Sequence, residues 1–257
     1  MRTVVVTGAA SGIGGATKAL LESRGDRVIG VDVHDSDVVA DLSTTAGRSD
    51  LVERVRELSG GGVDAIAAIA GVAGQTAQDV AVNYFGAIAT LEGLRPLLMG
   101  SSAPRAVVTA SMSSLLPHDD ELVDLCLAHD EAGARGRADK LVESGHPGRI
   151  YSSSKRALAR WLRRTAATDD WAGAGIPLNA IAPGIVNTPL MAPMLATAEQ
   201  RAGIAAQVPM PLHGFMEPSA PAALLAWLVS EENTHLCGQV IFIDGGSDVT
   251  IRGDSTW

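Results

Sequence analysis

Two side chains with complementary acid–base chemistry stand four residues apart in the segment Tyr151-Ser-Ser-Ser-Lys155. In a helix this spacing places the phenol and the ammonium on one face, separated by about 6 Å along the axis. A cation at that distance favours the phenolate, so we expect Lys155 to lower the pKa of Tyr151 from about 10 towards the working pH. Tyr151 would then be a general acid or base. The pair alone is weak evidence, because exposed helix pairs with this spacing are common.

A glycine-rich turn near the N-terminus has the composition of a phosphate-binding loop. It follows the strand-like run Thr3–Thr7 and precedes a helical pattern of apolar residues. Glycines permit positive φ and close approach of backbone amides, and the N-terminus of a helix favours an anion. This order of strand, turn and helix predicts a dinucleotide site, the alternative being a turn that needs small residues for packing alone. The candidate cofactor contacts in it are Gly8, Ser11, Gly12, Ile13 and Gly14.

An acidic residue, Asp32, stands at the end of the second strand-like run, about eighteen residues beyond Gly14. At that distance a carboxylate can accept hydrogen bonds from an adenosine ribose, and it would repel a 2′-phosphate. No Arg or Lys follows Asp32 directly or lies within the glycine turn. We therefore predict NAD(H) in preference to NADP(H). The alternative is a solvated aspartate at a strand end.

Three separated motifs together resemble the short-chain dehydrogenase/reductase family. They are Thr7-Gly-Ala-Ala-Ser-Gly-Ile-Gly14, Tyr151-Ser-Ser-Ser-Lys155, and Asn179-Ala-Ile-Ala-Pro-Gly184 followed by Thr188-Pro189. The resemblance extends over nearly the whole chain. It implies a homodimeric or homotetrameric oxidoreductase that interconverts a secondary alcohol and a ketone with NAD. Within the family, the long insertion described below most resembles the bacterial 3α-hydroxysteroid dehydrogenase/carbonyl reductase branch.

The resemblance also implies a role for four residues. Tyr151 would exchange a proton with the substrate oxygen, while Lys155 would lower the pKa of Tyr151 and hydrogen-bond the nicotinamide ribose. Ser111 would hold the substrate oxygen, although Ser113 and Ser114 lie close enough in sequence to leave the register open. Asn83 would position a water molecule in the proton relay, the alternative being an amide that only bridges neighbouring backbone.

Further cofactor contacts follow from the resemblance alone. They are Asp41, Leu42, Ala70, Gly71, Pro183, Gly184, Val186 and Thr188. Two features depart from the family pattern. Ala68-Ile69 replaces the usual Asn-Asn, so contacts there must come from the backbone. Ser111 and Tyr151 are also forty residues apart, much further than is usual in the family.

Apolar β-branched runs alternate with helical patterns along the chain, which is typical of βαβ units. The predicted strands are Thr3–Thr7, Arg27–Val33, Ala65–Ala70, Arg105–Thr109, Leu178–Ala182 and Gln239–Ile243. The predicted helices are Gly14–Ser23, Arg48–Leu58, Ala77–Leu98, Tyr151–Ala167 and Ser219–Val229. We predict an α/β fold: a single Rossmann-type domain over residues 1–257, with a doubly wound parallel sheet flanked by helices.

An insertion at about residues 113–149 interrupts this rhythm before the Tyr-Lys helix, where α/β connections usually take 2–6 residues. Its acidic Asp119-Asp-Glu121 and its Ala138–Val142 stretch predict two short helices. In many members of the family the Tyr-Lys helices pair across a dimer axis. An insertion that covers this helix would require a different dimer interface.

A Met-rich apolar stretch at about residues 188–217 occupies the place of the family's substrate lid. Methionine adapts to irregular apolar ligands, although a lid packed on the core would show the same composition. We expect an apolar substrate such as a hydroxysteroid or an alicyclic or aryl ketone. The alternative function is a dinucleotide-binding sensor or scaffold without catalysis.

Composition excludes several other classes. The chain has 20 Lys+Arg and 29 Asp+Glu residues, and the resulting net charge of −9 opposes nucleic-acid binding. No apolar run has the length of a membrane span, and the scattered histidines and two cysteines form no metal-binding motif. We therefore predict no membrane segment, no metal and a reducing, cytoplasmic location.

Overall fold

The computed structural model describes residues 1–255 and contains a seven-stranded sheet in which every neighbouring pair is parallel. The strands are β1 (Thr3–Thr7), β2 (Arg27–Asp32), β3 (Val38–Val39), β4 (Ala65–Ala68), β5 (Arg105–Thr109), β6 (Leu178–Pro183) and β7 (Val240–Ile243). Their order is β3-β2-β1-β4-β5-β6-β7. The chain therefore builds outwards in one direction from β1 and in the other from β4, which leaves a crevice at the carboxyl ends between them. The predicted doubly wound fold is confirmed.

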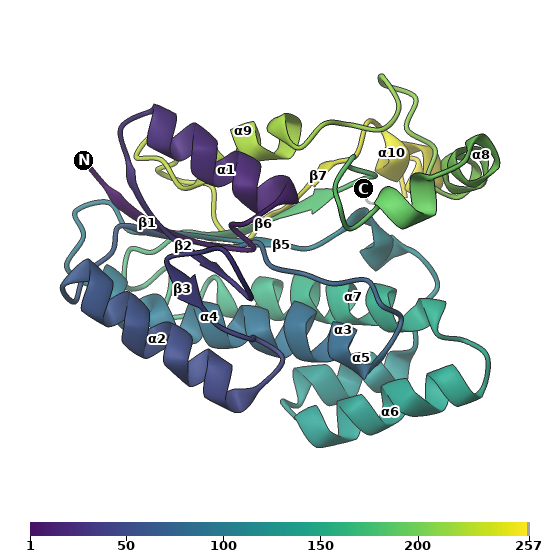
Figure 1. Cartoon of the computed structure of the whole chain (residues 1–257), viewed down its shortest axis with the longest axis horizontal. Coiled ribbons are helices and arrows are strands. Elements are labelled where there is room, and N and C mark those ends of the chain that lie inside the picture. The colour runs from purple at the N-terminus through teal and green to yellow at the C-terminus, as the bar shows by residue number, and fades with distance from the viewer. Residues whose placement is uncertain (256–257) are drawn as a thin grey trace.

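Helices cover both faces of the sheet (Figure 1). α1 (Gly12–Ser23) and α9 (Ser219–Leu228) lie on one face, and α2 (Thr45–Ser59), α4 (Ala87–Leu94) and α7 (Gly148–Thr165) lie on the other. The remaining helical segments are α3 (Ala77–Val80), η1 (Ala81–Gly86), η2 (Arg95–Leu98), η3 (Met112–Leu115), α5 (Asp120–Leu127), α6 (Glu131–Glu143), η4 (Ala192–Leu195), α8 (Ala198–Gln207) and α10 (Ser247–Arg252).

Two hydrophobic cores fill the space between the layers. Successive residues of a strand point to opposite faces, so Val5 joins the core under α2, α4 and α7, whereas Val4 and Val6 join the core under α1 and α9. All three side chains are fully buried. Burial on both faces explains why these strands are apolar runs without alternation.

The helical run predicted over Ala77–Leu98 is continuous but not uniform. It begins as α3, widens into the π-helical segment η1, continues as α4 and tightens into the 3₁₀ segment η2. Gly86 ends the π-helical segment where a Cβ would lie 2.9 Å from the Cβ of Leu42. Absence of a side chain there lets the helix pack closely against the chain that follows β3. The two-residue strand β3 was not predicted, since two residues carry no periodic signal.

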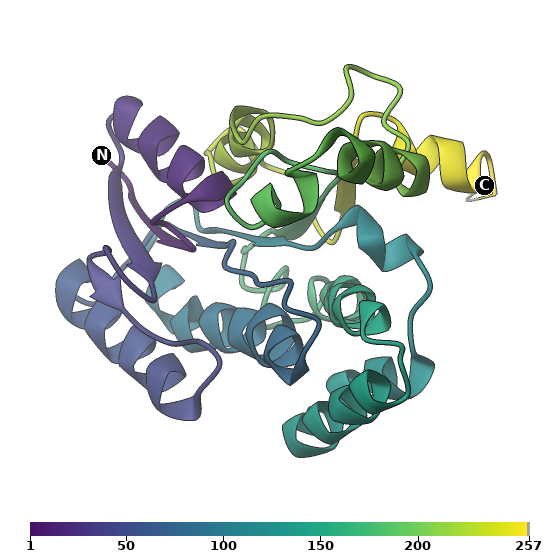
Figure 2. The same ribbon diagram turned by 45° about the vertical axis from the view of Figure 1, so that its right-hand side comes forward.

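The insertion forms two helices, as predicted, and packs beneath α7 (Figure 2). Asp119 caps α5 by accepting a hydrogen bond of 2.9 Å from the Leu122 amide, and its carboxylate forms an ion pair of 2.6 Å with Arg137 on α6. α6 is longer than the predicted Ala138–Val142, because small buried residues such as Ala134 give a weak apolar pattern. Within residues 1–255, no helix combines the length and apolarity needed to cross a bilayer.

Candidate active site

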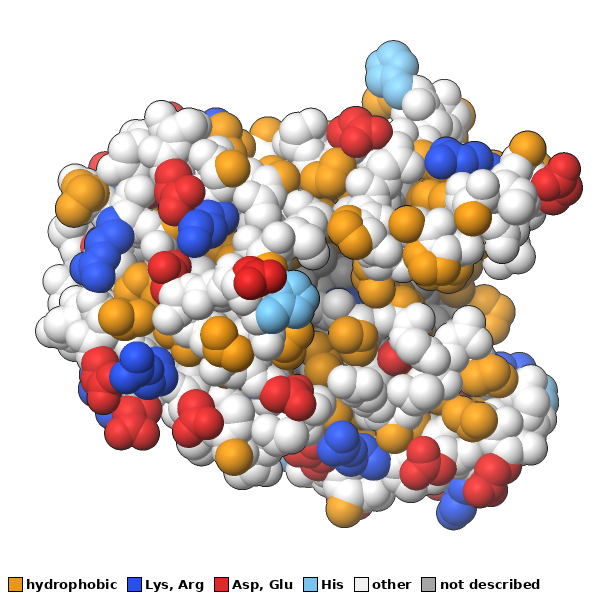
Figure 3. Space-filling model, in the orientation of Figure 1, with side chains coloured by type: hydrophobic (Ala, Val, Ile, Leu, Met, Phe, Trp, Pro, Cys, Tyr) orange, Lys and Arg blue, Asp and Glu red, His pale blue; other side chains and the backbone are white. Residues whose placement is uncertain are grey.

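A cavity of about 730 Å³ opens at the carboxyl ends of the strands. Figure 3 shows the hollow between the upper and lower parts of the molecule, with hydrophobic side chains around it. Every residue predicted to contact the cofactor or substrate lines this cavity, with the exception of Asn83. The fold therefore gathers segments that are far apart in the sequence. In residues 1–255 no cluster of His, Cys, Asp or Glu has the arrangement of a metal site.

The glycine turn has the backbone geometry that a phosphate loop requires. Gly8 and Gly12 have φ values of 71° and 54°, and a Cβ on Gly14 would lie 2.1 Å from the Gly8 carbonyl oxygen. Ser11 is the N-cap of α1, but its side chain makes no capping hydrogen bond. The first amides of α1 have no intrahelical acceptor. They and the positive end of the helix are therefore available to an anion in the cavity.

Asp32 is held in a fixed orientation at the end of β2. One carboxylate oxygen accepts a hydrogen bond of 2.9 Å from the Ala10 amide, and the other accepts one of 2.7 Å from the Val33 amide. The glycine turn thus fixes the carboxylate at the wall of the cavity. This geometry favours a ligand-binding role over a freely solvated side chain.

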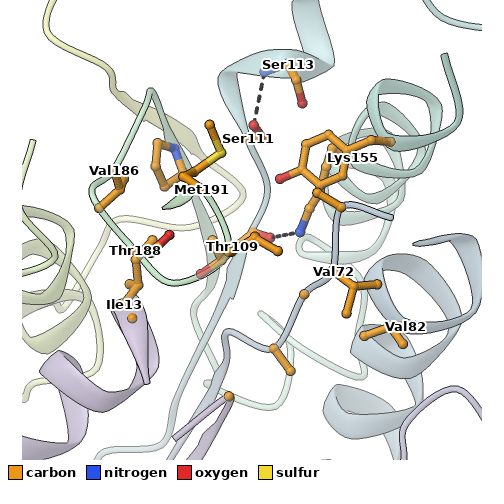
Figure 4. A pocket seen from close by; sticks show the side chains of 18 of the residues that line it. Ile13, Val72, Val82, Thr109, Ser111, Ser113, Lys155, Val186, Thr188 and Met191 are labelled. Carbon is orange, nitrogen blue, oxygen red and sulfur yellow. Dashed lines mark hydrogen bonds between the residues drawn. The ribbon is translucent and has the colours of Figure 1, made fainter. Parts of the chain in front are cut away.

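Ser111, which follows β5, lines the same cavity as Tyr151 and Lys155, which lie on α7. Figure 4 shows Ser111 and Lys155 at this cavity. The Lys155 ammonium donates a hydrogen bond of 2.8 Å to the Thr109 carbonyl and lies 5.8 Å from the centre of the Tyr151 ring. The Ser111 hydroxyl lies close enough to the Tyr151 phenol to lower its pKa. The structure therefore unites a hydroxyl, a phenol and an ammonium, as the sequence predicted.

The prediction for the pKa of Tyr151 is wrong in direction. Burial raises the pKa of Tyr151 above its ordinary value, the negative charge of Asp79 adds to this increase, and only the hydrogen bond with Ser111 opposes it. Burial also lowers the pKa of Lys155 to about 8, although Asp79 opposes that decrease. Spacing along a helix predicts that two groups are near each other, but it does not predict the desolvation that both of them experience.

The structure distinguishes among the three candidate serines. The Ser111 hydroxyl faces the cavity and accepts a hydrogen bond of 3.1 Å from the Ser113 amide. Ser113 also lines the cavity, and its buried hydroxyl has no partner within residues 1–255. Ser114 is buried and does not line the cavity. Geometry therefore favours Ser111, with Ser113 beside it.

Asn83 lies behind the cavity wall. Its amide oxygen accepts a hydrogen bond of 2.9 Å from the Val72 amide, and its amide nitrogen donates one of 2.8 Å to the Val72 carbonyl. The side chain thus fixes the loop that follows β4, which is the alternative interpretation of this residue. The predicted water in a proton relay stays a prediction.

The substrate side of the cavity has two walls. The lid contributes Leu190, Met191, Met194, Ile204 and Val208. The end of the insertion, residues 145–149, lines the cavity as well, and none of these residues was among the candidate site residues. The position of this segment immediately before Tyr151 was the sequence signal that could have placed it at the cavity.

The sequence analysis also did not identify Asp79, which lies one helical turn before Asn83.

Comparisons with known proteins agree with this geometry. A family model described as enoyl-(acyl carrier protein) reductase matches residues 138–248. The chain is 38% identical over 259 residues to a 3α-hydroxysteroid dehydrogenase/carbonyl reductase of Comamonas testosteroni, covering 98% of each chain. It is 31% identical to a cis-4-hydroxycyclohexanecarboxylate dehydrogenase of Sinomonas cyclohexanicum, covering 95% of this chain and 96% of the relative.

Solved structures include a similar chain. The structure of the 3α-hydroxysteroid dehydrogenase from Pseudomonas sp. B-0831 complexed with NADH matches with a TM-score of 0.90 and 38% identity, covering 98% of this chain and 99% of that one. Identity at this level over nearly the full length of both chains, together with the shared fold, establishes common ancestry. The chain therefore belongs to the short-chain dehydrogenase/reductase family of oxidoreductases.

Proposed function

We propose that this protein is an NAD(H)-dependent enzyme that interconverts an apolar secondary alcohol and its ketone. The observation that carries the proposal is the convergence of Ser111, Tyr151 and Lys155 on one cavity with the glycine turn and Asp32. A binding module would need the turn and the carboxylate only. The relative of known structure binds NADH, which supports the choice of nucleotide.

The residues present fit the nucleotide. The uncapped N-terminus of α1 suits a pyrophosphate, and the fixed carboxylate of Asp32 suits the two hydroxyls of an adenosine ribose. The basic residues in the cavity wall are Arg149 and Lys155, both contributed by α7 rather than by the region around β2. The absence of a cation beside Asp32 in the described wall favours NAD(H) over NADP(H).

When bound, NADH supplies a hydride from the C4 atom of its nicotinamide. Ser111 donates a hydrogen bond to the substrate carbonyl, which holds that oxygen beside Tyr151. Because burial raises the pKa of Tyr151, the phenol is protonated at neutral pH and can donate its proton to the oxygen during reduction. Lys155 places a positive charge 5.8 Å from the ring and stabilises the phenolate that this transfer leaves.

The lid and the insertion support an apolar substrate. Leu190, Met191 and Met194 of the lid line the cavity together with Leu116 and Pro117, and methionine side chains can adapt to an irregular ring system. The relatives named above act on a hydroxysteroid and on a hydroxycyclohexane carboxylate. We propose a hydroxysteroid or an alicyclic or aryl ketone as the substrate class.

The assembly we propose is a homodimer or homotetramer that does not use α7 as its interface. The insertion is joined to this helix by a hydrogen bond of 2.6 Å from the Ser152 hydroxyl to the Pro117 carbonyl. A second bond, of 2.9 Å, runs from the Asp119 amide to the Ser153 hydroxyl. With α5 packed on α7, a second copy of α7 cannot reach that face. A cytoplasmic location is part of the same proposal.

Initial rates with steroid, alicyclic and aryl ketones, measured with NADH and NADPH in parallel, test the proposed function. We expect turnover with NADH for at least one apolar ketone and a clear preference over NADPH. NADH binding without turnover of any ketone would favour a sensor. A severalfold preference for NADPH would contradict the role given to Asp32.

A further inference from the structure

We propose that Asp79 is the buried counter-charge of Lys155 and a positioning residue for the reaction. This inference deepens the proposed function, because it explains how the active-site lysine remains an ammonium inside the protein. Asp79 does not line the cavity and touches no predicted substrate or cofactor atom. Its effect would reach the reaction through Lys155 and through the loop that borders the cavity after β4.

Both charges are buried. Asp79 is 0% exposed and Lys155 is 3% exposed. The only hydrogen bond found for the Lys155 ammonium within residues 1–255 goes to a neutral acceptor, the Thr109 carbonyl, and no carboxylate of that part of the chain forms an ion pair with it. A buried ammonium without a compensating negative charge tends to lose its proton.

The other buried carboxylates have different partners. Asp119 is paired with Arg137, 2.6 Å away. Asp244 accepts hydrogen bonds of 3.0 and 2.7 Å from the amides of Gly246 and Asp248. In the described part of the chain, Asp79 and Asp244 thus have no cation in direct contact, and Asp79 is the one that lies on an element, α3, packed against the helix of Lys155.

A short segment links Asp79 to Lys155. The Asp79 carboxylate accepts hydrogen bonds of 2.9 Å from the Gly74 amide and 3.1 Å from the Gln75 amide. At the other end of this segment, a Cβ on Gly71 would lie 3.5 Å from the Lys155 ammonium and 3.0 Å from the Asn83 amide oxygen. Since Asp79 and Asn83 are four residues apart, one helical face fixes the whole loop against which Lys155 packs.

Four elements bring groups close to Lys155. α7 contributes Tyr151, α3 contributes Asp79, and β5 and η1 contribute the neutral Thr109 and Asn83. Of these, Asp79 is the group whose charge raises the pKa of Lys155 and so opposes burial. The interaction is reciprocal, because Lys155 and the amide bonds oppose the increase that burial causes in the pKa of Asp79.

An NMR titration can test this pairing without substrate. The chain has three lysines, Lys18, Lys140 and Lys155, so ¹³Cε labelling of lysine gives a spectrum in which Lys155 is assigned by its absence from Lys155→Arg. Asp79→Asn removes the charge and nearly preserves the shape. We expect it to lower the pKa of Lys155 by about one pH unit, since it removes the nearby opposite charge.

Two controls separate charge from shape. Asp64→Asn makes the same chemical change at a carboxylate that also accepts a backbone amide bond, of 2.8 Å from Thr3, at the opposite end of the sheet. It should leave the titration of Lys155 unchanged. Asp79→Glu retains the charge while disturbing the loop, and it should keep the pKa of Lys155 close to that of the wild type. A purely structural role predicts that Asp79→Glu disturbs the titration at least as much as Asp79→Asn.

The pH profile of ketone reduction supplies a second readout. A lower pKa of Lys155 moves the alkaline decline of kcat/KM to lower pH, so Asp79→Asn should lose about tenfold relative to the wild type one pH unit above the wild-type midpoint. If Asp79→Asn does not fold, Lys155→Met tests the pair from the other side. Loss of the cation should then raise the pKa of Asp79, measured from its ¹³Cγ resonance.

An unchanged pKa of Lys155 in folded Asp79→Asn would overturn the inference, as would an unchanged pKa of Asp79 in Lys155→Met. Neither titration depends on a substrate, a nucleotide or turnover. Failure of the proposed function therefore appears as absence of ketone reduction, and failure of this inference as an unaltered titration.

Discussion

Burial sets the acid–base character of the two groups that flank the reacting atoms. It raises the pKa of the Tyr151 phenol and lowers that of the Lys155 ammonium to about 8, so both groups tend towards their neutral forms. A neutral phenol suits the acid that ketone reduction needs, and the reverse reaction requires a base. The protonated phenol can thus act as the acid in ketone reduction at neutral pH, whereas the helical spacing alone suggested an easily ionised tyrosine.

The alkaline decline of ketone reduction should report Lys155. Below a pH of about 8 its ammonium is charged and stabilises the phenolate left by Tyr151, and above that pH the charge is lost. We expect kcat/KM for ketone reduction to fall as pH rises through about 8, because Tyr151 itself stays protonated there. Arginine keeps its charge to much higher pH. A decline near pH 8 that persists in Lys155→Arg would contradict the assignment to Lys155.

Alanine substitution of Ser111 and of Ser113 tests which of the two hydroxyls holds the substrate oxygen. Ser111→Ala removes the hydroxyl beside Tyr151 and should lower kcat/KM by about 10²-fold, the usual cost of losing a donor to the reacting oxygen. Ser113→Ala removes a hydroxyl without a partner in the described residues and should cost much less. The measurement is kcat/KM of both variants, with urea unfolding to confirm that the two are equally stable. A larger loss of kcat/KM in Ser113→Ala than in Ser111→Ala would show that Ser113, and not Ser111, holds the substrate oxygen.

At the scale of secondary-structure elements, the strand–turn–helix at the N-terminus depends on Gly14. An added Cβ would lie 2.1 Å from the Gly8 carbonyl oxygen, which no side-chain movement can relieve. We expect Gly14→Ala to lower the free energy of unfolding by about 2 kcal/mol or more and to weaken NADH binding. Gly15→Ala is the control, since its Cβ would meet the nearest atom at an ordinary 3.4 Å. Equal effects of the two substitutions on urea unfolding would refute this account.

The sequence predicts the elements that carry long apolar runs and misses those set by packing. β1 and β5 are recognisable as continuous apolar runs, and the helix carrying Tyr151 and Lys155 by its helical apolar pattern. The two-residue β3 is defined by its pairing with β2, and the π-helical η1 packs against Leu42, which is distant in the chain. Local pattern contains no information about such contacts.

The residues of the candidate site also fall into those that local motifs identify and those that only packing brings to the site. The residues of the glycine turn and the Tyr-Lys pair lie in contiguous motifs, so type and spacing identify them. Asp79 shares no motif with Lys155, and only the packing of α3 against α7 brings the two charges near each other. The end of the insertion likewise lines the cavity in a structure where α5 and α6 pack on α7.

At the scale of the whole molecule, the insertion determines which surfaces remain for assembly. An ion pair of 3.7 Å joins Arg160 on α7 to Asp124 on α5, so this face of α7 is already occupied within one chain. We expect light scattering to give the mass of two or four chains. Arg160→Glu should leave that mass unchanged, because the change lies outside the proposed interface. Dissociation of this variant into monomers would show that α7 forms the contact between chains.

The central claim is that the cavity assembled from both halves of the sheet transfers a hydride and a proton to one ketone. Reduction of an apolar ketone with NADH deuterated at C4, followed by mass spectrometry of the alcohol, measures this directly. We expect deuterium at the carbinol carbon with the wild type. Tyr151→Phe should lower the rate of incorporation by about 10³-fold and still bind NADH. Incorporation by Tyr151→Phe at nearly the wild-type rate, or NADH binding without labelled alcohol from any ketone, would contradict the claim.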